Sequence, residues 1–310
     1  TAVEIDSGSQ SGTPFPVYDP DQTTILINFA NTAVLDEFYS LPLQLSFTNL
    51  TAENYIGMSS GPASPSGFGT AVIYEPGADR VNDIGSTYDS TNNRHVIGYQ
   101  DQDNANQGTA IVGTVSGNTV TFGTAVVFEA ATTNYVMPVF DSTNDKVVIF
   151  YRDVGNSGYL TAIVGTVSGT SISFGTAVVV DSNSASFISA AFDSANGKVV
   201  CHWYDNTNTT GIVGTVSGTS ISFGTKATVN SLAGQYVDTV YDSNAGKVVV
   251  TYRAPTTNNG AARVGTVSGT SISYGSEVAF NSGNTEWRCS VFDPTTNKIA
   301  IFYKATRVKL

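Results

Sequence analysis

Apolar and polar residues alternate along most of the chain in short runs rich in Val, Ile, Thr and aromatic residues. Gly, Ser, Asn and Asp separate the runs. Alternation with a period of two is typical of half-buried β-strands, and the separating residues are those that favour tight turns. The longest apolar runs are far shorter than the roughly 18 residues of a membrane-spanning helix. The pattern predicts an all-β protein without membrane insertion.

One block of sequence occurs four times with little change. IVGTVSGNTVTFGTAVVF (111–128) returns at 163–180, 212–229 and 263–280, and a degenerate copy covers 55–74. Between the copies, an aromatic residue and Asp precede a polar turn and a β-branched run that ends in an aromatic residue. The Asp of this second unit recurs at a period of roughly 50 residues, as Asp89, Asp141, Asp193, Asp242 and Asp293.

Each repeat offers four short strands, and the Ser-Gly step of its VSGT segment suits a tight hairpin because glycine accepts positive φ. Four antiparallel strands in roughly 50 residues are typical of a β-propeller blade. A β-solenoid would have shorter coils, and a sandwich would not repeat its sequence. We expect one β-propeller domain over residues 1–310, with the aromatic-Asp strand innermost in each blade and the SISFGTAVV strand outermost.

The two ends of the chain complement each other. Residues 16–29 match the aromatic-Asp unit at 138–151, TAVEID (1–6) matches TAVVFE in an outermost strand, and ATRVKL (305–310) resembles a third strand. The N-terminal strand would then pair into the last blade and remove an open edge. This predicts six blades; the alternative is five blades with an irregular N-terminal arm.

The first blade is longer than the others, and the surplus falls in an insertion over residues 30–52. Val34, Leu35 and Phe38 predict one side of a short helix that ends at Pro42, followed by a strand-like LQLSF segment. Such a piece either packs on its own blade or docks a partner.

Charge and cysteine content narrow the function. Fourteen basic and 25 acidic residues give a formal net charge of −11, and a surface of this sign repels phosphate backbones, which argues against nucleic acid as a partner. Cys201 and Cys289 are too few for a disulfide framework, and His95 and His202 do not complete a metal cluster with them. We interpret both cysteines as buried packing thiols and both histidines as strand residues with internal partners. The start at Thr1 favours an excised domain over a processed protein.

Enzymatic signatures are weak. No Ser-His-Asp order or glycine-rich phosphate loop occurs in a suitable context, and the Asp boxes and arginine cluster of sialidases are missing. A glycosidase needs two carboxylates that face a cleft, and the acidic residues on loops or inner strands are Asp83, Asp101, Asp153, Asp205, Asp238 and Glu286. Calcium is an alternative ligand for Asp101 and Asp103, although their loop departs from the EF-hand spacing. We expect no enzyme activity and no cofactor; a glycoside-active enzyme is the lesser alternative.

Binding signals concentrate on one face of the predicted disc. The connections after the second strand and between blades share this face and vary between repeats, whereas the turns on the opposite face are uniform. Variable loops on a rigid scaffold are where function is usually placed. The loop-rich face is therefore the candidate working face.

Two aromatic sets occupy equivalent positions in the repeats. The set at the start of the inner strands would ring the channel mouth and stack on sugar rings, or else pack internally: Tyr135, Phe187, Tyr236 and Trp287. Near it, arginines would orient an anionic group and loop carboxylates would accept hydrogen bonds: Arg152, Arg253, Arg288, Asp153 and Asp205. The set at the end of the second strands is expected to be core: Phe29, Tyr99, Tyr151, Trp203, Tyr252 and Tyr303.

The GTVSGTSISFGTAVVF repeats, the FDSxxxKVVxxYRD segments between them and NLTAENYIGMSSG (49–61) resemble repeat regions in structural proteins of marine tailed phages. The resemblance covers most of residues 50–304 and brings no catalytic residues. It implies a virion-surface or extracellular tail-fibre, receptor-binding or decoration module, with other virion proteins as partners, through residues 30–52 in our interpretation. We expect a non-enzymatic module that binds a host-surface glycan or protein through the loop-rich face. The alternative is a purely structural spacer or docking platform.

Overall fold

The computed structural model describes residues 15–19, 24–30, 38–44, 71–75 and 81–305. These residues form antiparallel β-sheets and one short 3-10 helix, η1 (Val154–Asn156). Among them, no helix is long and apolar enough to cross a membrane. The prediction of an all-β chain is therefore confirmed for the part that the structure describes.

The first two sheets cover the N-terminal half of the chain. The first has four strands in sequence order: β1 (Phe15–Asp19), β2 (Thr24–Ala30), β3 (Phe38–Gln44) and β4 (Val72–Ile73). The second has nine strands: β5 (Val81–Asp89), β6 (Arg94–Asp101), β7 (Gln107–Ser116), β8 (Thr119–Phe122), β9 (Val126–Asp141), β10 (Lys146–Asp153), β11 (Tyr159–Ser168), β12 (Ser171–Phe174) and β13 (Val178–Ser184). Strand β9 joins two repeats, because its first part pairs with β7 and its last part with β10.

The C-terminal half repeats the same order in separate sheets. One five-stranded sheet contains β14 (Ser186–Asp193), β15 (Lys198–Tyr204), β16 (Thr209–Ser217), β17 (Ser220–Phe223) and β18 (Ala227–Asn230). The next contains β19 (Gln235–Asp242), β20 (Lys247–Arg253), β21 (Gly260–Ser268), β22 (Ser271–Tyr274) and β23 (Val278–Asn281). The last described strands pair with each other: β24 (Thr285–Asp293) and β25 (Lys298–Ala305).

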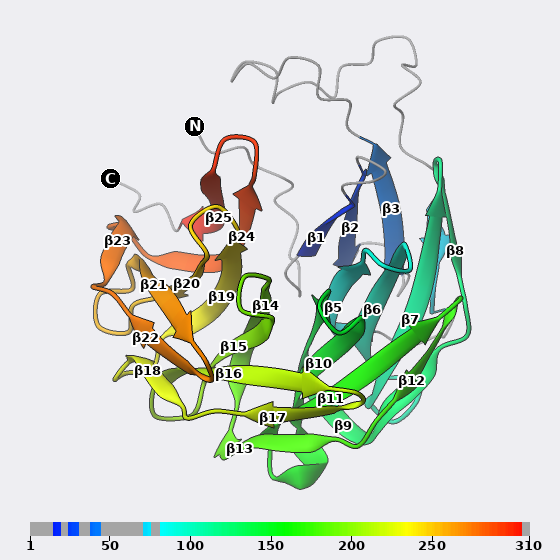
Figure 1. Ribbon diagram of the computed structural model, residues 1–310, viewed down its shortest axis with the longest axis horizontal. Helices are drawn as coiled ribbons and strands as arrows, with labels where there is room; N and C mark the ends of the chain where they lie inside the picture. Colours follow the sequence, from blue (N-terminus) through cyan, green and yellow to red (C-terminus); the bar gives the residue numbers. More distant parts are fainter. Residues whose placement is uncertain (1–14, 20–23, 31–37, 45–70, 76–80, 306–310) are drawn as a thin grey trace.

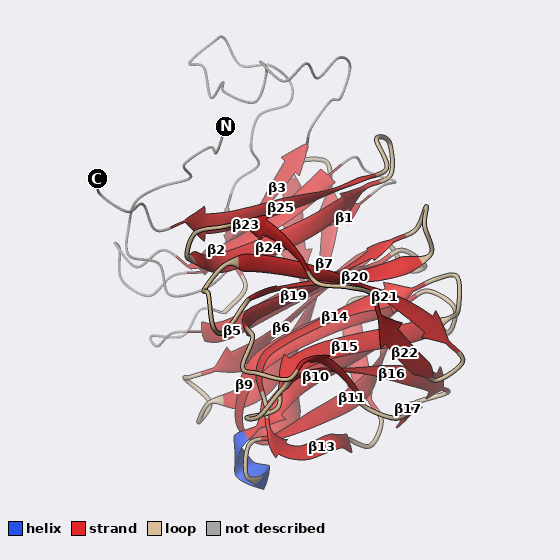
Figure 2. Ribbon diagram, turned by 90° about the vertical axis from the view of Figure 1, so that its left-hand side faces the viewer, coloured by secondary structure: helices blue, strands red, loops and turns tan. Residues whose placement is uncertain are grey.

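The sheets lie side by side around a common centre, and the first strand of each repeat is nearest to that centre (Figure 1). The inner strands β5, β9, β14, β19 and β24 contact one another in this order and line a cavity of about 170 Å³. Seen edge-on, the strands run between two faces where the turns and loops lie (Figure 2). The aromatic-Asp strand is innermost, as the sequence predicts.

The outermost strand differs from the expectation, because the predicted SISFGTAVV strand is two strands. In the repeat that contains residues 212–229, β17 and β18 both pair with β16, and the chain breaks between them at Gly224. A Cβ on Gly224 would lie 1.8 Å from the carbonyl oxygen of Thr270 in the next repeat, and Gly175 meets Thr219 in the same way. The glycine thus lets the VSGT turn of the neighbouring repeat approach the backbone.

The aspartate that marks each repeat holds a turn. The Oδ1 atom of Asp141 accepts hydrogen bonds from the backbone N–H groups of Thr143 and Asn144 at 2.9 and 3.0 Å, and its Oδ2 atom accepts one from the Asn144 side chain at 2.8 Å. Asp89 and Asp193 make the same set of bonds. Such side chain-to-backbone bonds specify a tight turn, which accounts for the recurrence of this residue.

The aromatic residues at the ends of the second strands form the core between neighbouring sheets. The predicted members in β6, β10, β15 and β20 are fully buried: Tyr99, Tyr151, Trp203 and Tyr252. Tyr303 in β25 is 39% exposed, which corrects the prediction for this member. Within the described part, β25 pairs only with β24, so no third strand covers it. The side chain of Phe29 lies outside the described part.

The segment 30–52 is only partly described. Residues 38–44 form β3, which pairs along its whole length with β2. The helix predicted to include Phe38 and to end at Pro42 is therefore wrong at these residues, which are extended and lie inside a strand. The remainder of the predicted insertion, with residues 1–6 and 305–310 of the predicted closure, lies largely outside the described residues.

Candidate functional site

A backbone irregularity recurs in four successive inner strands, near the point where each begins to pair with the second strand of its repeat. Asp83, Tyr135, Phe187 and Tyr236 have φ values of 50°, 54°, 55° and 53°. The strand registers shift at or opposite these positions, as in β-bulges. Positive φ is unfavourable for non-glycine residues with bulky side chains, and bulges re-aim the side chains that they carry. Repetition of the same strained geometry makes this row the candidate functional site.

The structure brings three of the four predicted ring aromatics together. The ring centroids of Tyr135 and Phe187 are 5.9 Å apart, and those of Phe187 and Tyr236 are 5.2 Å apart. All three side chains are half-buried. Each precedes by two residues a position that lines the central cavity, namely Met137, Ser189 and Asp238. The aromatic row therefore lies on the inner strands beside the residues that line this cavity.

Arg253 extends the aromatic row. Its guanidinium carbon lies 5.1 Å from the ring centroid of Tyr236, a cation–π arrangement. It also contacts the side-chain oxygen of Gln235 and forms an ion pair with Glu286 at 3.8 Å. Glu286 in turn lies 3.6 Å from the ammonium group of Lys304. Arg253 therefore lies beside the Tyr236 end of the aromatic row.

At the other end of the row, Asp83 takes the repeat position of the aromatic residues, and its carboxylate accepts a hydrogen bond from Asn134. Burial raises the pKa of Asp83, whereas a hydrogen bond from Asn134 at 3.1 Å and the charge of Arg152 act in the opposite direction. Asp83 occupies the repeat position that Tyr135 occupies next along the chain. The row thus runs from the Asp83 carboxylate through three aromatic rings to Arg253.

Trp287 and Arg288 lie on β24, next to the register shift between Glu286 and Arg288. The backbone places Trp287 at the repeat position of Tyr236, as predicted. Their side chains lie outside the described part, so their contribution to the row stays a prediction.

The loop carboxylates proposed as ligand contacts are bound to their own loops. Asp153 caps η1, and its Oδ1 atom accepts a hydrogen bond from the backbone N–H of Asn156 at 3.0 Å. Asp205 Oδ1 accepts bonds from the N–H groups of Thr207 and Asn208 at 3.1 and 2.7 Å. Neither residue belongs to the aromatic row.

The other acidic residues considered for catalysis also have structural partners. Asp238 accepts a hydrogen bond from the backbone N–H of Ser290 and another from the Ser189 hydroxyl at 3.3 Å. The Oδ1 atom of Asp101 accepts from the N–H of Asn104 at 3.1 Å, and Asp103 in the same loop is exposed. Glu286 is paired with the two cations described above.

The histidines and cysteines are mainly packing residues. His202 is fully buried between the Thr239 and Tyr274 hydroxyls at 2.9 and 2.8 Å, which confirms its predicted internal partners. His95 is also buried. Cys201 is a buried thiol, but Cys289 is only half-buried and lines the central cavity, which corrects its predicted burial.

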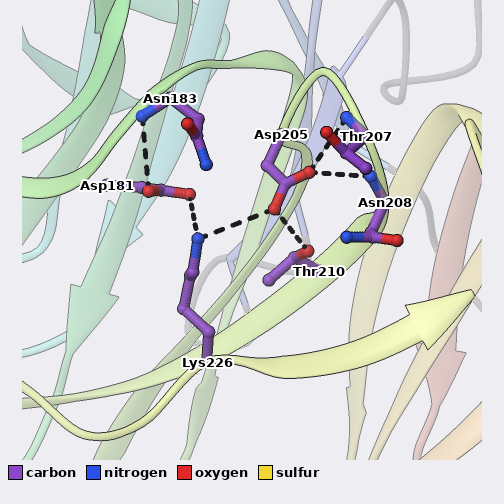
Figure 3. A network of polar contacts seen from close by, with 7 residues as sticks. All are labelled: Asp181, Asn183, Asp205, Thr207, Asn208, Thr210 and Lys226. Carbon is purple, nitrogen blue, oxygen red and sulfur yellow. Dashed lines mark hydrogen bonds and ion pairs between the residues drawn. The ribbon is translucent and has the colours of Figure 1, made fainter. Parts of the chain in front are cut away.

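A second polar cluster lies between neighbouring sheets and was not foreseen from the sequence. The ammonium group of Lys226 lies 2.7 Å from Asp181 Oδ2 and 3.6 Å from Asp205 Oδ2 (Figure 3). Thr210 donates a hydrogen bond to the same Asp205 oxygen at 3.1 Å. The available signal was that Lys226 stands where the preceding repeats have Ala125 and Ala177.

No family model matches this chain, and no curated protein matches it either. Its structure is similar to that of AofleA from the fungus Arthrobotrys oligospora, with 10% identity, a TM-score of 0.50 and coverage of 87% of this chain and 76% of AofleA. A variant of AofleA with three arginines replaced by alanine gives 12% identity, a TM-score of 0.51 and coverage of 89% and 77%. At such low identity the likeness is one of fold.

Proposed function

We propose that this chain is a non-enzymatic binding protein that takes a carbohydrate at the mouth of its central cavity, on the loop-rich face. The main support for this proposal is the row of Tyr135, Phe187 and Tyr236, with Arg253 beside it. Strained backbone positions that repeat across a scaffold mark sites where function sets the geometry. Aromatic rings beside fixed polar groups match the apolar faces and hydroxyl edges of sugars.

The size of the cavity supports binding at its mouth. Ligand pockets usually measure about 300–1,000 Å³, whereas the central cavity has about 170 Å³. A sugar chain would therefore lie across the entrance and contact the exposed parts of the aromatic row. Half-burial of these rings limits the entropy cost of holding them in place.

The architecture that we propose is a six-bladed β-propeller closed by residues 1–6. Phe302 and Tyr303 of β25 are 61% and 39% exposed, whereas their counterparts Phe150 and Tyr151 of β10 are fully buried. A further strand paired with β25 would bury these apolar side chains and close the open edge of the sheet. The phage-like repeats support a place on a virion or other exterior surface.

The test is a panel of immobilised glycans probed with the wild type and with single variants. Tyr236→Ala and Arg253→Ala should each weaken binding about tenfold, because each removes roughly 1–2 kcal/mol of contact energy. Tyr241→Ala is the matched control, since this half-buried tyrosine of β19 contacts Ala195 in the turn on the opposite face. It should bind like the wild type. Melting temperatures of the three variants show whether each is folded.

Two outcomes would reject the proposal. One is the absence of any bound glycan, which favours the structural spacer or a protein partner. The other is undiminished binding by folded Tyr236→Ala and Arg253→Ala proteins, which would place the glycan elsewhere. Release of reducing sugar from a bound glycan would instead support the enzyme alternative.

A further inference from the structure

The junctions between neighbouring sheets contain a repeated pair of carboxylates. At each junction one acidic residue comes from the outer strand of the preceding repeat and the other from the end of the second strand of the next repeat. The three pairs are Glu75 with Asp101, Glu129 with Asp153, and Asp181 with Asp205. Only the third pair has a cation of the protein beside it, among the described residues.

Lys226 shows what the third junction requires. Its ammonium group lies between Asp181 and Asp205, which are 7% and 4% exposed (Figure 3). Two carboxylates brought together in a poorly solvated site repel each other, and a positive charge between them removes the repulsion. The hydroxyl of Thr210 completes the oxygen-lined site.

The junction of Glu129 and Asp153 has the same frame without the lysine. Tyr151 lies directly opposite Thr161 in the β10–β11 ladder, as Trp203 lies opposite Thr210 in the β15–β16 ladder. Residues opposite each other, and residues two apart on one strand, share a face of the sheet. The side chains of Tyr151, Asp153 and Thr161 therefore point to one side, and the Tyr151 hydroxyl donates to Glu129 Oε2 at 3.1 Å on that side.

An unpartnered hydroxyl is aimed into this junction. Thr161 is 2% exposed, and its Oγ1 atom has no hydrogen-bond partner. In the third junction the equivalent atom, on Thr210, donates to the carboxylate beside the lysine. A buried hydroxyl without a partner costs about 1–3 kcal/mol. A cation that coordinates the Thr161 oxygen would therefore stabilise the folded protein.

The junction of Glu75 and Asp101 repeats these features. Tyr99 donates to Glu75 Oε2 at 3.1 Å and lies opposite Thr109 in the ladder. Thr109 is also 2% exposed with an unpartnered Oγ1 atom. Glu75 and Asp101 both lie close enough to Tyr99 for their charges to add to the effect of burial, which raises the pKa of its hydroxyl.

We propose that both lysine-free junctions bind a hard divalent cation, with Ca²⁺ as the ion of choice, and that Lys226 replaces this ion in the third. The donor set is two carboxylates with a threonine hydroxyl and a tyrosine hydroxyl nearby, all hard oxygen ligands that suit Ca²⁺. Groups of three His, Cys, Asp or Glu ligands do not converge in the described part, so water completes the coordination. Few charged ligands give weak sites, with Kd values of about 10⁻⁴–10⁻³ M.

Both junctions are open to an ion from solution. Glu129 and Glu75 are half-buried and leave a route to solvent.

The repeats supply matched variants for the test. Ala125→Lys and Ala177→Lys place an ammonium group at the exposed positions equivalent to Lys226, where the new side chain needs no repacking of the core. The full chain is titrated with CaCl₂ by calorimetry, and its melting temperature is measured in EDTA and in millimolar CaCl₂. The wild type should bind two Ca²⁺ ions and melt at a higher temperature in CaCl₂.

The variants decide the outcome. The double variant Ala125→Lys/Ala177→Lys should bind no Ca²⁺ and melt in EDTA at least as high as the calcium-loaded wild type. Lys226→Ala should lose stability in EDTA and regain it in CaCl₂ with a third bound ion. The proposal is overturned if the wild type neither binds Ca²⁺ nor gains stability at millimolar concentration, or if the double variant binds Ca²⁺ like the wild type. A glycan-binding result has no bearing on these readouts.

Discussion

His202 shows how a single buried residue ties stability to pH. Its two ring nitrogens contact the hydroxyls of Thr239 and Tyr274, and burial lowers its pKa to about 3. In the unfolded chain the residue has a pKa of about 6.5. Above that value both states are neutral at this site, and the stabilisation is complete.

Stability should fall as the pH drops from about 6.5 toward 3, because the unfolded chain then takes up a proton that the folded chain does not. The expected contribution is about 1.4 kcal/mol per pH unit. Urea unfolding of the wild type and of His202→Gln at a series of pH values isolates it from other titrating groups. The stability advantage of the wild type should shrink with decreasing pH. A constant difference would show that His202 takes up its proton at the same pH in the folded and in the unfolded protein.

At the residue scale, the sequence predicts which residues occupy equivalent positions, but it does not predict their backbone geometry. Alignment of the repeats places Tyr135, Phe187 and Tyr236 at one position, and the structure brings their rings together. The positive φ values at this position could not be foreseen, because a bulge depends on the register of two strands and tyrosine disfavours this backbone region. Asp153 and Asp205 were assigned to a ligand although Asp before a polar loop also serves to cap it.

At the scale of elements, the glycine break in the outer strand explains how neighbouring repeats dock. A Cβ on Gly224 would lie 1.8 Å from the backbone oxygen of Thr270. At Gly275, the same position one repeat later, the nearest atom of the described residues would be 3.8 Å away. The two glycines therefore differ in packing although they share a place in the repeat.

Gly224→Ala should destabilise the protein by about 1–3 kcal/mol more than Gly275→Ala, since overpacking forces the neighbouring turn to move. Gly275→Ala is the control for the intrinsic effect of alanine in this strand. Denaturant unfolding of both variants measures the difference. Equal stabilities would mean that the turn at Thr270 does not pack against the break.

The order of strands within each repeat was predictable because alternation and turn residues are local signals. The split of the outer strand was not, because it depends on the next repeat. The Lys226 cluster was missed for the same reason: Asp181 and Asp205 meet only when two sheets pack together. The substitution of one lysine for alanine in near-identical repeats was the one sequence signal for it.

At the scale of the whole molecule, the exposed face of β25 is the feature that a closed ring would explain. Phe302 is 61% exposed, whereas Phe150 at its repeat position is fully buried. Replacement of residues 1–6 by a Gly-Ser segment of equal length should lower the melting temperature of the whole domain, because an open edge remains in the last blade. An unchanged melting temperature would contradict closure by the N-terminal strand.

The central claim is that a carbohydrate binds at the mouth of the cavity, and mapping of the bound sugar by NMR tests it most directly. Amide and side-chain shifts of the labelled protein are followed during titration with a glycan that the panel identifies. The account predicts that the perturbed residues cluster at Tyr135, Phe187, Tyr236 and Arg253. Perturbations confined to the opposite face around Asp141 and Asp193, or none at millimolar glycan, would contradict it.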